Sequence, residues 1–177
     1  DHGAKFLIHV AESAHERTAM REQHGGTTPV HYLAELGVLD SDTILVHAVH
    51  VDAKEADLIA ASGASVVINT ESNMKLASGI APLALYLERG IAVGLGTDGC
   101  ASNNDLDLFQ EMGLTALAQC THPEYPASLS AVDMLLLATN EGARALGLED
   151  RAGSLEAGKR ADIVAVRTAG PHALALH

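Results

Sequence analysis

The sequence predicts an α/β fold in which four parallel strands alternate with helices. Four short aliphatic runs, at residues 5–10, 43–47, 65–69 and 91–95, have the length and β-branched content of buried strands. Segments with helical spacing separate them, and strands connected in this way pair in parallel through right-handed crossovers. Four such units correspond to half of an eight-stranded barrel. We therefore expect a partial barrel rather than a complete one.

The expected helices follow the strands in order, and capping residues and glycines delimit them. Asp52 is placed to cap one helix, and Gly63 follows the end of that helix. Helices are expected at residues 13–23, 29–36, 52–61, 82–89, 104–119 and 130–146, with a polar loop at 70–79. A further β-rich run at 163–166 is predicted as a strand, although no partner for it is evident.

Composition excludes several classes of partner. The net charge of −12 disfavours nucleic acids and anionic membranes. No apolar run approaches the roughly 20 residues that span a bilayer, and no secretory signal opens the chain. The two cysteines, Cys100 and Cys120, have neither zinc-finger spacing nor a disulfide framework. A cytoplasmic location is the resulting expectation.

Three residues that bear metal-binding groups follow predicted strands. His9 and His47 end the first two strands, and Asp98 lies in the glycine-rich run 94–104 between the fourth strand and a helix. The carboxyl ends of parallel strands meet at one edge of a sheet, where such proteins place their chemistry. Imidazole and carboxylate ligands suit Zn²⁺, Fe²⁺ or Ni²⁺. We expect one divalent metal here, with Zn²⁺ as the first choice.

Glu12 lies three residues beyond His9, where the strand passes into a loop. A carboxylate there can act as general acid and base on a water activated by the metal. The residues alone also allow structural interpretations: Glu12 as a charge at a helix start, His47 as a hydrogen-bonded core residue and Asp98 as a cap or turn residue. The segment 72–76 allows an interpretation as a simple polar loop, but it also supplies amide and ammonium groups on the same face as the proposed site.

Five sequence segments resemble the amidohydrolase superfamily, and in particular its branch of 5-methylthioadenosine/S-adenosylhomocysteine and 5′-deoxyadenosine deaminases. They are His-Val-Ala-Glu at 9–12, Leu-Val-His-Ala-Val-His at 45–50, the Ser-Asn-Met-Lys segment at 71–82, the Thr-Asp-Gly-Cys segment at 94–109 and the Gly-Ser-Leu-Glu-Ala-Gly segment at 153–162. The resemblance covers nearly the whole chain. It implies strands five to eight of a metal-dependent-hydrolase barrel at 1–152, followed by the return into a small β-sandwich domain at 153–177.

The resemblance also implies roles for individual residues. His9 and Asp98 would bind the metal, with Glu12, His47 and Asp98 as catalytic residues. Glu12 would move a proton from the attacking water to the purine ring, while His47 would orient that water. The substrate, an adenosine-like nucleoside, would contact Glu12 and Asp98 and also Ser72 and Asn73. Hydrolysis at C6 of the ring would release ammonia.

The chain departs from the family pattern in two ways. The His-x-His pair of the first barrel strand has no counterpart before His9, so we expect a C-terminal half. Ile68 and Thr70 stand where the family usually has His and Pro. The alternatives are therefore a related chlorohydrolase or guanine/cytosine-type deaminase, or a non-catalytic fragment. Because a half barrel has unpaired strand edges, we expect the chain alone to be marginally stable or to form a homo-oligomer.

Overall fold

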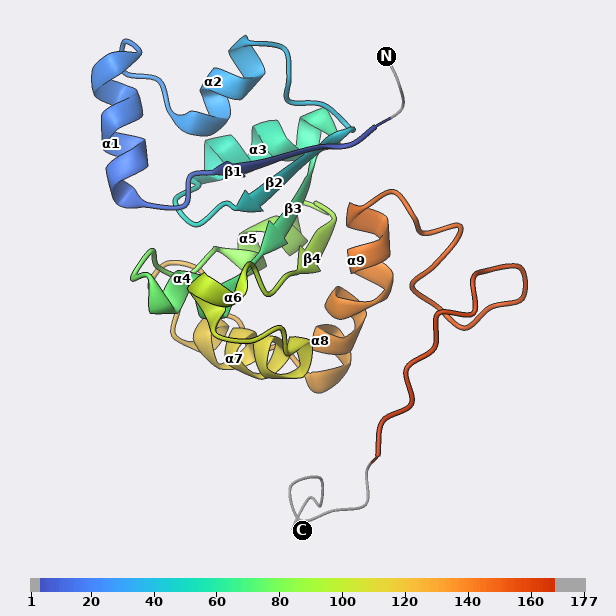
Figure 1. Cartoon of the computed structure of the whole chain (residues 1–177). Coiled ribbons are helices and arrows are strands. Elements are labelled where there is room, and N and C mark those ends of the chain that lie inside the picture. Colours follow the sequence, from blue (N-terminus) through green and yellow to red (C-terminus); the bar gives the residue numbers. More distant parts are fainter. Residues whose placement is uncertain (1–3, 168–177) are drawn as a thin grey trace.

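The computed structural model describes residues 4–167 and shows strands alternating with helices (Figure 1). The strands are β1 (Phe6–Val10), β2 (Thr43–His47), β3 (Ser65–Ile68) and β4 (Val93–Leu95). The helices are α1 (Ala14–Gln23), α2 (Pro29–Glu35), α3 (Ala53–Ser62), α4 (Thr70–Lys75), α5 (Leu83–Glu88), α6 (Cys100–Asn103), α7 (Leu108–Cys120), α8 (Ala131–Ala138) and α9 (Asn140–Ala145). All four expected strands are present.

The strands form one parallel sheet in the order β1-β2-β3-β4. The register aligns Val10 with His47 and Ile68 with Leu95, so the carboxyl ends of the strands lie along one edge. Parallel pairing requires helical crossovers, and the helices between strands provide them. The predicted α/β class and the parallel arrangement are confirmed.

The core lies between the sheet and the helices that cover it. Every residue of β2 is buried, as expected for a central strand with both faces covered. Leu83 and Tyr86 of α5, which contacts β4, belong to the same buried cluster as Ile91 and Val93. Figure 1 shows α9 beside β4, where a Cβ atom added to Gly94 would lie 3.2 Å from Cα of Gly142. The absence of a side chain on Gly94 thus permits the close approach of α9.

The structure corrects two helix predictions. The expected helix at 104–119 begins only at Leu108, as α7, because the Asp107 side chain caps it there; a separate short helix, α6, ends just before the expected range, at Asn104 with its left-handed φ of 92°. The expected helix at 130–146 is interrupted at Thr139, whose φ of −127° and ψ of −86° are not helical. In both places a single non-helical residue redirects the chain, which helical spacing alone does not reveal.

Two further predictions are wrong. The polar loop expected at 70–79 begins with helix α4, whose first N–H groups are bonded to Glu111 from α7, a contact distant in sequence. The run 163–166 is not a strand: among residues 4–167 no strand pairs with it, and Val164 is 81% exposed. Figure 1 shows this segment leading away from the sheet. The proposed sandwich segment also includes residues 168–177, which lie outside the described residues.

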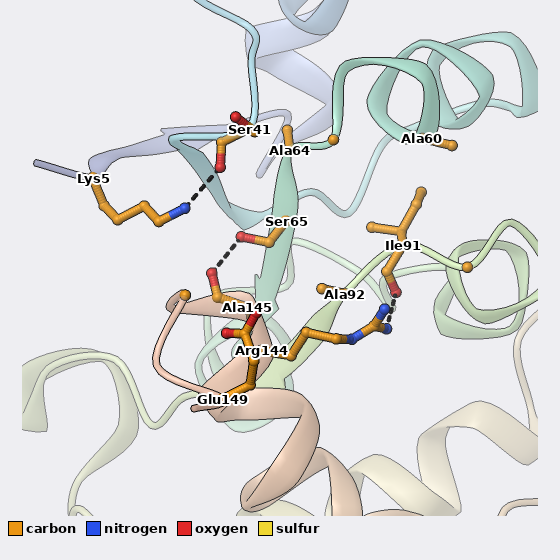
Figure 2. A pocket seen from close by; sticks show the side chains of 13 residues that line it. Lys5, Ser41, Ala60, Ala64, Ser65, Ile91, Ala92, Arg144, Ala145 and Glu149 are labelled. Atoms are coloured by element: carbon orange, nitrogen blue, oxygen red, sulfur yellow. Dashed lines mark hydrogen bonds between the residues drawn. The ribbon is translucent and has the colours of Figure 1, made fainter. Parts of the chain in front are cut away.

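A cavity of about 340 Å³ lies at the amino ends of β3 and β4, opposite the edge that carries the predicted ligands (Figure 2). The hydroxyl of Ser65 donates to the carbonyl oxygen of Ala145 there, which fastens α9 to the start of β3. A second cavity, of about 450 Å³, adjoins His50 and Tyr125. Neither of these two cavities is lined by His9, His47 or Asp98. Among residues 4–167, no helix has the length and apolar character needed to cross a bilayer.

Candidate metal centre

Three strand-end side chains converge at the carboxyl edge of the sheet. His9, His47 and Asp98 each offer one ligand atom, and these atoms all lie within 4.8 Å of one another. Nε2 of His47 lies 3.2 Å from Nδ1 of His9, and the two rings meet edge to face. The sequence predicted that these residues share one edge. The structure adds that His47 offers a ligand atom to the same group as the two predicted metal ligands, His9 and Asp98.

The backbone adopts left-handed conformations where these residues leave their strands. Ala11, His47, Ala48 and Asp98 have φ values of 51°, 72°, 45° and 57°. Such conformations are unfavourable for residues with a Cβ atom and persist where the surrounding structure enforces them. Asp98 precedes the N-cap residue of α6, Gly99, and is not itself the cap. These features favour a functional interpretation of Asp98 over a capping one.

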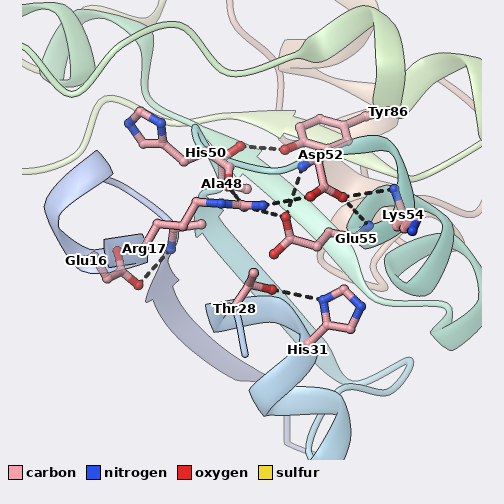
Figure 3. Close-up of polar contacts among 11 residues, drawn as sticks. Glu16, Arg17, Thr28, His31, Ala48, His50, Asp52, Lys54, Glu55 and Tyr86 are labelled. Carbon is pink, nitrogen blue, oxygen red and sulfur yellow. Dashed lines mark hydrogen bonds and ion pairs between the residues drawn. The ribbon is translucent and has the colours of Figure 1, made fainter. Parts of the chain in front are cut away.

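The loop after β2 is held from three sides (Figure 3). The Tyr86 hydroxyl donates to the carbonyl oxygen of Ala48, and the Arg17 guanidinium donates to that of His50. The backbone N–H of His50 donates to the carbonyl oxygen of Ala11 at 2.8 Å, which ties this loop to the one after β1. The position of His47 therefore depends on α1 and α5 as well as on its own strand.

Arg17 also pairs with two carboxylates of the β2–α3 segment. Glu55 is fully buried, and its Oε2 contacts Nη1 of Arg17, while Oδ2 of Asp52 lies 2.7 Å from Nη2. Burial acts to lower the pKa of Arg17, but the two carboxylates outweigh it and raise that pKa. A buried carboxylate is stable in its charged form only while it is paired. The Arg17–Glu55 pair therefore anchors α1 to the first turn of α3, directly after the loop that follows His47.

Glu12 faces His47 rather than the helix that follows. Its Oε2 lies 3.8 Å from Nε2 of His47, and its Oε1 accepts a hydrogen bond of 3.4 Å from the Ser78 hydroxyl. Ser13, not Glu12, caps α1, and the Glu16 carboxylate accepts from the backbone N–H of Glu12 at 2.9 Å. The side chain of Glu12 is thus left available on the side of the metal-binding group.

Helix α4 places two buried side chains against the site. The Ser72 hydroxyl donates to Oδ2 of Asp98 at 2.7 Å, and Oδ1 of Asn73 lies 2.8 Å from Nδ1 of His47. With the amide oxygen facing it, Nδ1 carries the proton and Nε2 presents a lone pair to the group. Sequence reasoning assigned Ser72 and Asn73 to the substrate and missed these contacts, because α4 was expected to be a loop.

The electrostatic environment keeps Asp98 ionised. Burial acts to raise its pKa, but hydrogen bonds from the hydroxyls of Ser102 and Ser72 and from the N–H of Gly99 together hold the pKa below its usual range. The Ser102 hydroxyl lies 2.6 Å from Oδ2 of Asp98. An ionised carboxylate is the form that a metal requires.

His50 and Lys75 lie outside this group. Nε2 of His50 is 2.8 Å from the carbonyl oxygen of Ser78. Lys75 is bonded to α6, with its ammonium 2.6 Å from Oδ1 of Asn104. At the two positions that depart from the family pattern, Ile68 is buried in the core and Thr70 accepts a hydrogen bond from the Thr115 hydroxyl.

The donor set suits a divalent metal. Two imidazoles and one ionised carboxylate are ligands that Zn²⁺, Fe²⁺ and Ni²⁺ accept. Their ligand atoms already lie close together without any rearrangement of the strands. The hydrogen bond that Ser72 donates to Asp98 and the one that Asn73 accepts from His47 orient these two residues, as outer groups do around established metal ligands. The residues present therefore fit a metal at this edge.

A comparison with protein families identifies the fold. The model of the amidohydrolase family matches residues 1–175. The chain belongs to the amidohydrolase family. In this chain, the candidate site lies at the strand ends of a parallel sheet, as the sequence predicted.

Comparison with individual proteins shows similarity to nucleoside deaminases. The chain is 48% identical over 165 residues to the 5′-deoxyadenosine deaminase of Methanothermobacter thermautotrophicus, covering 93% of this chain and 38% of that protein. It is 45% identical to the 5-methylthioadenosine/S-adenosylhomocysteine deaminase of Carboxydothermus hydrogenoformans, covering 91% and 37%. A crystal structure of an adenosine deaminase from Xanthomonas campestris with bound zinc superposes with a TM-score of 0.91 at 39% identity, covering 98% and 39%. The chain thus spans less than two fifths of these relatives.

The buried ion pair behind His47 should dominate the stability of this region. We expect Glu55→Gln to lower the free energy of unfolding by about 2 to 3 kcal/mol, near the low end for breaking a buried pair because Arg17 keeps Asp52 as a partner. The matched control is Asp57→Asn, which removes an exposed partner of Arg89 and should cost less than about 1 kcal/mol. Denaturant unfolding measures both. Equal costs would contradict the role of the buried pair.

The Asn73–His47 contact should fix the tautomer of His47. Asn73→Ala leaves the buried N–H of His47 without an acceptor, and we expect a loss of about 1 to 3 kcal/mol in stability. We also expect ¹⁵N NMR of the imidazole to report a mixture of tautomers in place of one. Asn140→Ala, at an exposed position on α9, is the control. An unchanged His47 spectrum in Asn73→Ala would show that another group orients the ring.

Proposed function

We propose that the protein containing this chain is a metal-dependent hydrolytic deaminase of adenosine-like nucleosides. The substrates would be 5-methylthioadenosine, S-adenosylhomocysteine or 5′-deoxyadenosine, and the products ammonia and the inosine-type nucleoside. The observation that carries the proposal is the convergence of His9, His47 and Asp98, with Glu12 beside them, at one sheet edge. The names of the relatives at 45–48% identity support the substrate class.

We propose Zn²⁺ as the metal, held by His9 and Asp98. Zinc bound in the Xanthomonas campestris structure supports this choice. His47 belongs to the same group by distance, and its lone pair at Nε2 faces the ligand atoms. When bound, the metal would lower the pKa of a water molecule to about 7 and so supply the nucleophile at neutral pH.

In the proposed reaction, the protein side chains handle the proton and the attacking water. Glu12 takes a proton from the water and delivers it to the purine ring as the oxygen adds to C6. His47 and Asp98 hold that water by hydrogen bonds, and Asp98 assists the transfer of the second proton of the water to the amino group, so that the C6–N bond breaks, ammonia leaves and the added oxygen becomes the carbonyl oxygen. Asn73 is a proposed substrate contact, supported by its buried amide nitrogen, which has no hydrogen-bond partner among residues 4–167. Ser72 is proposed to act beside it, next to Asp98.

We propose that the four strands are the second half of an eight-stranded barrel, with residues 1–152 as the barrel part and 153–177 as the return to a β-sandwich. The order of the parallel strands and the coverage of the longer relatives support this arrangement. Further metal ligands and the contacts to the ribose would then come from the other half. Homo-oligomer formation and a cytoplasmic location are also proposed; the exposed thiols of Cys100 and Cys120 agree with a reducing compartment.

In the complete protein, Glu12→Gln should lower kcat for deamination by about 10²-fold or more, because glutamine keeps the shape of the side chain but cannot accept a proton. Metal content should stay unchanged, since Glu12 is not among the grouped ligands. Glu22→Gln, at an exposed position of α1, is the control and should keep full activity. Ammonia release from the three nucleosides and elemental analysis are the measurements.

The outcomes separate the proposal from its alternatives. Ammonia release that depends on Glu12 supports the deaminase. Metal uptake without ammonia release from any of the three nucleosides contradicts the proposed substrates, and chloride release from a chlorinated heteroaromatic compound would then identify a chlorohydrolase. A complete protein that takes up no metal would be a non-catalytic member of the family.

A further inference from the structure

We propose that Glu111, on α7, is a positioning residue that holds α4 in place and, through α4, fixes Asp98 and His47. Glu111 touches neither of these two residues. It acts through the backbone of a six-residue helix that contacts both of them. The inference depends on the proposed function only in that Asp98 and His47 are taken as site residues.

Glu111 is fully buried and bonds to the start of α4. Its Oε1 accepts a hydrogen bond from the backbone N–H of Thr70, and both of its oxygens lie 3.3 Å from the N–H of Glu71. Four residues further along α7, the Thr115 hydroxyl donates to the Thr70 hydroxyl at 2.8 Å. Two successive turns of α7 therefore hold one residue of α4.

Helix α4 needs an external partner at this end. The first N–H groups of any helix lack acceptors within the helix, and a side chain at the N-cap position usually supplies one. The N-cap residue of α4, Asn69, makes no such bond with its side chain. A negative charge at this end also interacts favourably with the helix dipole. The Glu111 carboxylate thus does from a distant helix what a local cap does elsewhere.

The short length of α4 transmits this constraint to the site. Ser72 and Asn73 lie within one turn of Thr70, are 0% and 1% exposed, and bond to Asp98 and His47. The opposite end of α4 is held by Lys75, which donates to the carbonyl oxygen of Ala101 at 3.0 Å. A helix of this length has little stability of its own, so its position depends on such contacts. Loss of the Glu111 contact should therefore displace or loosen both site contacts.

The surroundings of Glu111 shift its pKa, so its ionisation can be followed through the pH dependence of stability. The pKa of Glu111 is raised to about 7: burial is the largest cause, the hydrogen bonds from the N–H groups of Glu71 and Thr70 oppose it, and the nearby carboxylates of Glu71 and Asp105 add to it. The folded protein thus binds this proton more tightly than the unfolded chain. Stability from this group falls as pH rises from about 4.5 to about 7.

Hydrogen exchange of α4, measured by mass spectrometry in the complete protein, tests the proposal. Glu111→Gln replaces one of the two acceptor oxygens by an NH2 donor beside the N–H groups of Thr70 and Glu71, and we expect exchange in the peptide that spans α4 to rise roughly tenfold, with α1 unchanged. Thr115→Val keeps the branched shape and removes only the hydroxyl bonded to Thr70, so it provides a milder variant if Glu111→Gln does not fold. It should raise exchange in the same peptide by a smaller factor.

The matched control is Glu71→Gln, the same substitution at a half-buried side chain that accepts from Gln110. It should leave exchange in α4 unchanged, because the N–H of residue 71 is retained. Unchanged exchange in both Glu111→Gln and Thr115→Val would overturn the proposal. An equal increase in Glu71→Gln would also overturn it, since the effect would then follow from any lost charge near α4.

Two further readouts distinguish positioning from general stabilisation. Between about pH 5 and 6.5, Glu111 should make the unfolding constant of the unmodified protein rise about tenfold per pH unit, because the folded state holds one more proton than the unfolded chain. Glu111→Gln should remove this contribution. With a nucleoside that is deaminated, kcat and kcat/KM should both fall, because α4 carries the proposed substrate contacts Ser72 and Asn73 as well as the bonds to Asp98 and His47. A fall in stability with unchanged kcat would overturn the positioning role. If no nucleoside is deaminated, the proposed function fails, but the exchange and pH measurements still decide the role of Glu111.

Discussion

Parallel pairing of β1 to β4 is the constraint on which the candidate site depends. Because all four strands run in the same direction, the residues that end them emerge along one edge of the sheet. His9, His47 and Asp98, separated by up to 89 positions in the sequence, reach one another only through this register. An antiparallel strand at any of these places would send its last residue to the opposite edge.

The strand ends alone do not orient the side chains, and a set of buried polar contacts does. Tyr86 and Arg17 hold the loop after β2, and Ser72 and Asn73 hold the acidic and imidazole groups. Buried hydrogen bonds of this kind are costly to leave unmade, so they favour a single arrangement. They also allow left-handed backbone at His47 and Asp98 to persist. The support is distributed over several helices, although the ligands come from strands.

Much of the fold was predictable because its signals are local. Aliphatic runs marked all four strands, and Asp52 and Gly63 delimited α3 as expected. The errors occurred where a distant contact or a single residue decided the outcome. Helix α4 is bonded to Glu111 from α7, and the predicted strand at 163–166 has no pairing strand in the described part of the chain. Short elements have too little intrinsic stability to form without such partners.

The class of the fold was predictable from the sequence alone, as were the strand ends near which His9, His47 and Asp98 lie and the position of Glu12 beside them. Local periodicity and residue chemistry suffice for these inferences, since parallel strands always bring their carboxyl ends to one edge. The packing of the folded chain was needed to show that Ser72 and Asn73 contact Asp98 and His47, and that Glu111 caps α4. Those contacts join residues 26 to 41 positions apart. No local pattern encodes them, because they depend on how α4 and α7 pack beside the sheet.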